Sequence, residues 1–163
     1  MVFFDTLLAQ LTHDEMEAVL AHELGHFKRR HIIKRTISGF AISLAGFALL
    51  GWLSQQAWFY TGLGVRPNMT GNDAIALLLF MMALPVFMFF VSPLFAQLSR
   101  KHEFEADAYA ARNASATRLA QALVKLYKDN ASTLTPDPLH SAFYDSHPPA
   151  AARIARLKSF AGT

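Results

Sequence analysis

The chain has 163 residues, of which 53% are hydrophobic and only 17% are charged, whereas an average soluble domain carries about a quarter charged residues. Its formal net charge is +3, but no patch of Lys and Arg is interleaved with aromatic residues, which argues against nucleic acid as a partner. Cysteine is absent, which excludes disulfides and thiolate ligands, so any metal site must use His, Asp or Glu.

The amino-terminal part predicts the end of a short strand at residues 2–4, followed by a helix. Thr12 and Glu15 have the spacing of a capping box, in which each side chain satisfies a free N–H at the start of a helix. Acidic residues follow at the start and basic residues gather near residues 28–35, as the helix dipole favours. We therefore expect one helix from the capping box to about Arg35.

The stretch AVLAHELGHFKRRH, residues 18–31, lies on this predicted helix. His22 and His26 are four residues apart, so both imidazoles project from one face and can reach one ion. Glu23 is turned about 100° from His22, next to the metal but outside its ligands, where a general base for a zinc-bound water would stand. An ordinary basic amphipathic helix is the alternative, but this pattern of residues at this spacing favours a metal site.

Two long apolar runs follow, at residues 36–65 and 74–99, and neither contains a charged residue. Each holds the roughly 20 apolar residues needed to cross the hydrocarbon core of a bilayer. We predict transmembrane helices at 36–58 and 74–97. A buried hairpin inside a soluble fold is the alternative, but a soluble core of this size rarely needs two such runs.

The charges that flank the runs predict their orientation. Five Lys or Arg residues precede the first run, Arg100 and Lys101 follow the second, and the connecting loop contains Arg66 as its only basic residue. The positive-inside rule then places both outer ends on the cytoplasmic side and the loop on the far side. The segments on either side of the hairpin should meet on one face of the membrane.

A catalytic zinc site needs a third protein ligand and an open position for water. His31 lacks the spacing that the third histidine has in metzincins. The motif HEFEAD offers a better source: Glu103 and Asp107 share a helix face, so one can bind the metal while the other accepts a hydrogen bond from a ligating imidazole. His102 competes for the ligand role, and Glu105 points to another face, where it is solvated or ion-paired.

The last third of the chain predicts a helix that continues from the second apolar run and another that Ser115 caps. Residues 130–148 predict a loop. Pro149 suits the first turn of a closing helix at 149–160.

Four segments together resemble the integral-membrane zinc proteases of the CAAX prenyl protease type. They are VFFDTLL at 2–8, HELGH at 22–26, SRKHEFEADAYA at 99–110 and SHPPAAARI at 146–154. The related heat-shock membrane metalloproteases share HExxH, the later ExxxD and a histidine–proline pair, but the residues of these segments fit the CAAX type better. The resemblance covers nearly the whole chain.

This resemblance implies a mainly α fold in which zincin-like metal-site helices flank a transmembrane hairpin. It implies a single membrane-embedded peptidase domain over residues 1–163, the carboxy-terminal portion of a larger architecture. One zinc ion per chain would be bound by His22, His26 and Glu103, with Glu23 as the general base. Asp107 would hold a ligating histidine. His147 would donate to the oxyanion, and Arg153 would organise the substrate or the site.

The expected function is a membrane zinc metalloendopeptidase with its active site on the cytoplasmic side of the bacterial inner membrane or the endoplasmic reticulum. Its partners would be the lipid bilayer and a peptide or protein substrate near the membrane, prenylated or not. Three alternatives stay open: a heat-shock-type quality-control protease, a membrane protein that binds zinc without catalysis, and a helical module that uses residues 28–35 to dock on anionic lipid.

Overall fold

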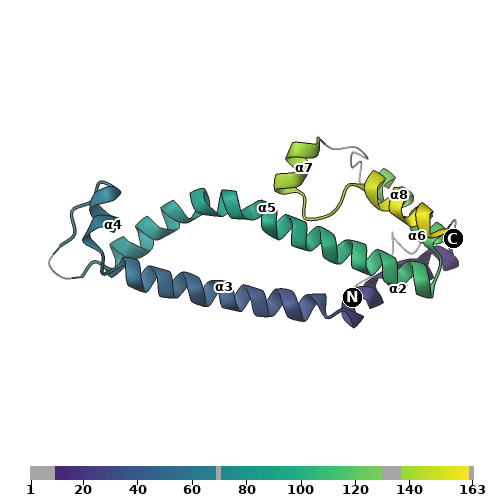
Figure 1. The fold of residues 1–163 in the computed structure, drawn as a ribbon, viewed down its shortest axis with the longest axis horizontal. Helices are drawn as coiled ribbons and strands as arrows, with labels where there is room; N and C mark the ends of the chain where they lie inside the picture. Colours follow the sequence, from purple (N-terminus) through teal and green to yellow (C-terminus); the bar gives the residue numbers. More distant parts are fainter. Residues whose placement is uncertain (1–9, 69–70, 130–136, 162–163) are drawn as a thin grey trace. The chain divides into compact units, whose positions relative to one another are not determined.

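The computed structural model describes residues 10–68, 71–129 and 137–161, and every regular element in these ranges is a helix (Figure 1). The mainly α prediction is confirmed, while the strand predicted at residues 2–4 lies outside the described ranges. The helices are α2 (His13–Lys28), α3 (His31–Leu53), α4 (Ala57–Gly62), α5 (Asp73–Asn113), α6 (Ala116–Asp129), α7 (Pro138–Tyr144) and α8 (Ala150–Ala161).

Helix α2 begins as predicted but ends earlier. The backbone N–H of Thr12 donates to Oε2 of Glu15 at 2.7 Å and the N–H of Glu15 donates to Oγ1 of Thr12 at 3.4 Å, which completes the capping box. The single helix predicted as far as Arg35 is wrong. Arg29 caps α2, Arg30 adopts a left-handed conformation with φ of 56°, and a new helix starts at His31.

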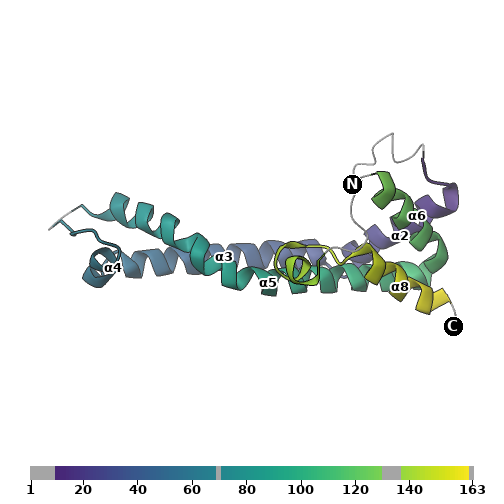
Figure 2. The same cartoon turned by 90° about the horizontal axis from the view of Figure 1, so that it is seen from above.

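The chain divides into two compact units, and the first contains the chain up to Ile32 together with Ser92 onward. In this unit α6 packs against both α2 and α8, beside the carboxy-terminal part of α5, as both ribbon views show (Figures 1 and 2). The shared core consists mostly of alanine with a few leucines, so the helices approach closely. Its buried members are Ala18, Ala21, Ala110, Ala116, Leu119, Ala120, Leu123 and Leu157.

Polar contacts at the edge of this core hold α6 in place. Oγ of Ser115 accepts from the N–H of Arg118 at 3.3 Å, so the predicted cap of α6 is present. Nζ of Lys125 donates to Oε2 of the buried Glu15 at 2.6 Å and thereby ties α6 to the start of α2. This contact lowers the pKa of Glu15, which keeps its carboxylate charged.

A short helix, α7, interrupts the segment that was predicted to be a loop. Oδ1 of Asp137 accepts from the N–H of His140 at 2.9 Å, and Pro138 occupies the first helical position, a combination that favours a helix start. Nη1 of Arg100 on α5 donates to the carbonyls of Ser141 and Asp145, at 2.7 and 2.9 Å. Because these carbonyls lie at the end of α7, Arg100 holds the start of the following loop against α5.

The second unit, Ile33–Val91, holds most of α3, α4 and the amino-terminal part of α5. A small cluster of Phe59, Tyr60, Ala76 and Leu79 packs where these elements meet. Helices α3 and α5 are each long and apolar enough to span a membrane, and only 6% of the most apolar window of either helix is buried. Side chains so exposed do not form the core of a soluble hairpin, which argues against that alternative.

The helix over the first apolar run covers residues 31–53, whereas the predicted span was 36–58. Residues 57–62 form the separate helix α4 instead. The second predicted span, 74–97, lies wholly within α5, which continues without interruption to Asn113 and so carries the HEFEAD motif on the same helix.

Candidate metal centre

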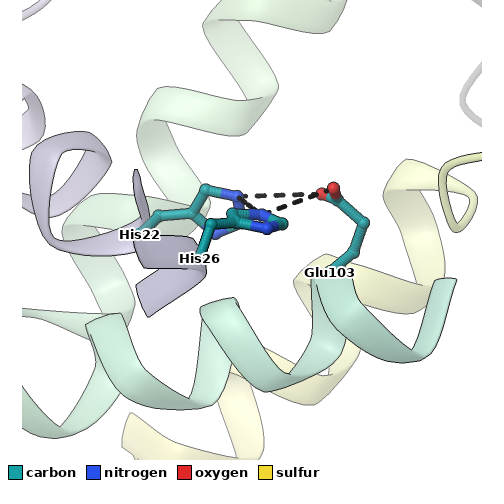
Figure 3. A group of neighbouring side chains, drawn as sticks. All are labelled: His22, His26 and Glu103. Carbon is teal, nitrogen blue, oxygen red and sulfur yellow. Dashed lines mark hydrogen bonds and ion pairs between the residues drawn. The ribbon is translucent and has the colours of Figure 1, made fainter. Parts of the chain in front are cut away.

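Two imidazoles from α2 and one carboxylate from α5 converge in the first unit (Figure 3). Nε2 of His26 lies 3.2 Å from Nε2 of His22 and 3.5 Å from Oε1 of Glu103, and Nε2 of His22 lies 3.7 Å from Oε2 of Glu103. One ligand atom from each residue falls within 4.8 Å of the others. His22 and Glu103 are buried, and His26 is partly exposed.

Gly25 allows this convergence because it sits where α2 crosses α5. A Cβ atom at this position would lie 3.0 Å from Cα of Ala106, 3.1 Å from its carbonyl oxygen and 3.1 Å from Cβ of Tyr109. Two of these neighbours are backbone atoms, and contacts of 3.0 to 3.1 Å are tighter than ordinary van der Waals contact, so a larger residue here would require the two helices to move apart by a few tenths of an ångström. The same crossing faces His22 and His26 toward Glu103, one turn before Ala106.

Asp107 stands behind His22. Its Oδ1 lies 2.9 Å from Nδ1 of His22, the ring nitrogen that faces away from Glu103. Arg153 on α8 clasps the same carboxylate: Nε donates to Oδ2 at 2.8 Å and Nη2 donates to Oδ1 at 2.6 Å. Burial alone would raise the pKa of Asp107, but His22 and Arg153 outweigh it and hold the pKa below its usual range. Asp107 is therefore a charged, fixed carboxylate against the back of His22.

Glu103 has two further neighbours, His147 and Arg153, both of which were predicted as site residues. Nδ1 of His147 lies 3.3 Å from Oε1 of Glu103, and Nη1 of Arg153 lies 3.3 Å from Oε2. Burial raises the pKa of Glu103, but His147 and Arg153 lower it by more, so Glu103 is ionised. The contact with Glu103 in turn raises the pKa of His147, which keeps that imidazole protonated to higher pH.

The state of His26 suits a metal ligand. Burial, together with the neighbouring His22, lowers the pKa of His26 to about 4, so its imidazole is neutral near pH 7. A neutral imidazole has the free lone pair that a metal requires. Two imidazoles and a carboxylate, with no cysteine in the chain, form a ligand set that fits a catalytic zinc ion.

Glu23, the predicted general base, is exposed on α2 directly after His22. His102, the competing ligand, lies elsewhere: its ring stacks on that of His31, with centroids 4.1 Å apart, and it is not in the His22–His26–Glu103 group. Glu105 is ion-paired, as one of its two predicted states required, with Oε1 4.0 Å from Nζ of Lys101, and its Oε2 lies 3.1 Å from Nε2 of His31.

His31 is the buried residue at this site whose position sequence reasoning missed. Its spacing does not fit the third-ligand pattern of metzincins, and a continuous helix to Arg35 would place it on a different face from His26. The signal available was a histidine five residues beyond His26 followed by a distant acidic motif. That signal is too weak to reveal the turn at Arg30.

A model of the family described as Peptidase family M48 matches residues 1–161 of the chain. The chain belongs to peptidase family M48. Among curated relatives, CAAX prenyl protease 1 of Saccharomyces cerevisiae is 36% identical over 171 residues, which cover 96% of this chain and 37% of that protein. The CAAX prenyl protease 1 homolog of Arabidopsis thaliana is also 36% identical, over 96% of this chain and 36% of its own length.

The crystal structure of S. mikatae Ste24p matches this M48 family member with a TM-score of 0.82 and 33% identity, over 96% of this chain and 39% of that one. The expected resemblance to CAAX prenyl proteases and the expected helical fold are thereby confirmed. The chain spans little more than a third of the length of the relatives that it matches.

Proposed function

We propose that this chain is the metal-binding, catalytic portion of a membrane zinc metalloendopeptidase of the CAAX prenyl protease type, folded as one membrane-embedded peptidase domain. The observation that carries the proposal is the meeting of His22 and His26 with Glu103, from helices far apart in the sequence, with ligand atoms within 4.8 Å of one another. A zinc ion held by three protein ligands keeps a position open for water, which is typical of catalytic rather than structural sites.

In this proposal a bound zinc ion would act as a Lewis acid, which lowers the pKa of bound water and polarises the scissile carbonyl. Glu23 is one residue from a ligand and open to solvent, so its carboxylate takes the proton of the attacking water and passes it to the leaving amine. His147, held protonated near Glu103, donates a hydrogen bond to the developing oxyanion. Asp107 and Arg153 keep the ligands in place.

Metal removal and replacement test the proposal. The purified chain in lipid should contain one zinc ion per chain by elemental analysis and should cleave a peptide. Treatment with a chelator should abolish cleavage, and added zinc should restore it. Paired peptides of the same sequence, with and without a farnesyl group, would show whether the substrate is prenylated. Stoichiometric zinc without cleavage of either peptide would instead support the non-catalytic zinc-binding alternative.

We propose further that α3 and α5 cross the bilayer, with the metal centre on the cytoplasmic side. Basic residues lie before α3 and after the apolar part of α5, and Arg66 is the only basic residue of the connecting loop. Because the chain has no cysteine, single variants report orientation cleanly. In sealed vesicles that expose the cytoplasmic face, an impermeant maleimide should label Lys28→Cys and spare Arg66→Cys. The reverse pattern would contradict this orientation.

A further inference from the structure

His31 lies between the candidate metal ligands and a second carboxylate. It is 4% exposed, its Nδ1 lies 3.1 Å from Nδ1 of His26, and its Nε2 lies 3.1 Å from Oε2 of Glu105. The ring of His102 covers one of its faces, at an interplanar angle of 13°. Both ring nitrogens of a buried histidine are therefore engaged, one toward each neighbour.

Binding of a metal by His26 would set the direction of these hydrogen bonds. Nε2 of His26 faces His22 and Glu103, so it must keep its lone pair for the ion, and the ring proton then resides on Nδ1. That proton is donated to Nδ1 of His31, which must accept it. The proton of His31 then lies on Nε2 and is donated to Glu105. Only this arrangement satisfies both contacts at once.

We propose that His31 and Glu105 are positioning residues that fix the ring orientation and tautomer of His26 for metal binding. They do for His26 what Asp107 does for His22, through one additional imidazole. The inference rests on the proposed zinc site, since it assigns a purpose to a residue that contacts a ligand and to the carboxylate that contacts that residue. Mutation of residues that hydrogen-bond to a metal ligand typically lowers metal affinity by about 10- to 100-fold.

The backbone around His31 supports this role. Arg30 has φ of 56°, a region that non-glycine residues rarely occupy, and this turn separates α2 from α3. Had α2 continued, His31, five residues after His26, would project from a different face of that helix. The turn instead brings His31 back against His26. Unfavourable backbone geometry next to a functional group is typical of positions that the surrounding contacts hold in place.

Variants of His31 separate its two hydrogen bonds. The amide of His31→Asn occupies the place of Nδ1 and can accept from His26, but it does not reach Glu105. The amide of His31→Gln reaches toward Glu105 and loses the contact with His26. His31→Phe removes both bonds and keeps a flat ring on His102. The exposed His13 at the start of α2 offers a control, His13→Asn, that removes an imidazole far from the ligands.

The measurement is zinc affinity of the full chain by competition with a chelating dye, together with the absorption spectrum of the cobalt-loaded protein. We expect His31→Phe and His31→Gln to bind zinc about 10- to 100-fold more weakly and to alter the cobalt spectrum. His31→Asn and His13→Asn should stay within a few fold of the unchanged chain. Glu105→Ala should weaken binding, and Glu105→Gln, which keeps an acceptor, should weaken it less.

Equal zinc affinity in His31→Asn and His31→Gln would overturn the inference, because a residue that acts by packing alone makes no distinction between them. That comparison holds even if His31→Phe fails to fold, since the two amides are both polar and similar in size. Failure of the unchanged chain to bind zinc would remove the proposed function as well. Equal affinities with normal zinc content would remove this inference alone.

Discussion

Replacing Glu23 with Gln should lower kcat/KM for peptide cleavage by about 10²- to 10⁴-fold while the zinc content stays at one ion per chain. The amide keeps the size of the side chain but cannot take a proton from water. Glu23 is exposed and outside the His22–His26–Glu103 group, so the substitution should leave metal binding and folding almost unchanged. Peptidase assays beside elemental analysis of the same preparation measure both quantities.

Glu17→Gln provides the matched control, since Glu17 is another exposed glutamate on α2 and lies before the first histidine of the motif. It should cleave at the rate of the unchanged chain. Cleavage by Glu23→Gln within a few fold of that rate would show that another group accepts the proton. Loss of zinc in Glu23→Gln would show that the carboxylate holds the metal rather than the water.

Replacing Arg153 with Met should destabilise the first unit by about 3–5 kcal/mol, the usual effect of removing one partner from a buried ion pair. The guanidinium is 6% exposed and is the bidentate partner of Asp107 as well as a neighbour of Glu103. Without it, the buried carboxylates of Asp107 and Glu103 both lose the guanidinium that they contact. Thermal or denaturant unfolding of the metal-free chain, followed by circular dichroism, measures the loss.

Three comparisons isolate this ion pair. Lys158→Met, at an exposed position on the same helix, should change stability little. Arg153→Lys keeps the charge but not the two parallel hydrogen bonds, so its loss should be intermediate. Adding Asp107→Asn to Arg153→Met should recover part of the stability because it removes one orphaned charge. Stability of Arg153→Met equal to that of Lys158→Met would show that the pair contributes nothing.

Much of the fold follows from local patterns in the sequence. The capping box at Thr12 and Glu15, the cap at Ser115 and the two apolar runs all correspond to elements of the structure, because each depends on neighbouring residues or on composition. The break at Arg29 and Arg30 was missed because it has no glycine or proline to mark it. Its conformation depends on contacts that His31 makes with residues distant in the chain.

The helix α7 was missed for a different reason. Asp137 followed by Pro138 is a start signal for a helix, but a segment rich in Pro, Ser and Thr favours a loop, which is the prediction for these residues. What stabilises α7 lies elsewhere, in the side chain of Arg100 against the carbonyls at its end. A contact between residues some forty positions apart leaves no periodic trace in the sequence.

At the site, the contacts that could be predicted are those of residues that helical spacing places on one face. His22 with His26, and Glu103 with Asp107, are each four apart, and the structure brings both pairs together. The roles of Glu23, His147 and Arg153 in the reaction stay predictions. The contact of His31 with Glu105 could not be predicted. His31 follows a helix break that the sequence does not mark, and Glu105 was expected on a different helix face from Glu103.

Gly25 adds a packing requirement to the motif HELGH. The general pattern HExxH leaves this position open, since neither zinc nor water touches it. In this chain a larger residue would press α2 against the backbone of Ala106 and require a shift of a few tenths of an ångström between the helix that carries both imidazoles and the helix that carries the carboxylate. The motif HELGH therefore contains a contact with α5 as well as metal ligands. Its two histidines are the candidate ligands, and its glycine determines how closely α2 can approach the helix that supplies the third.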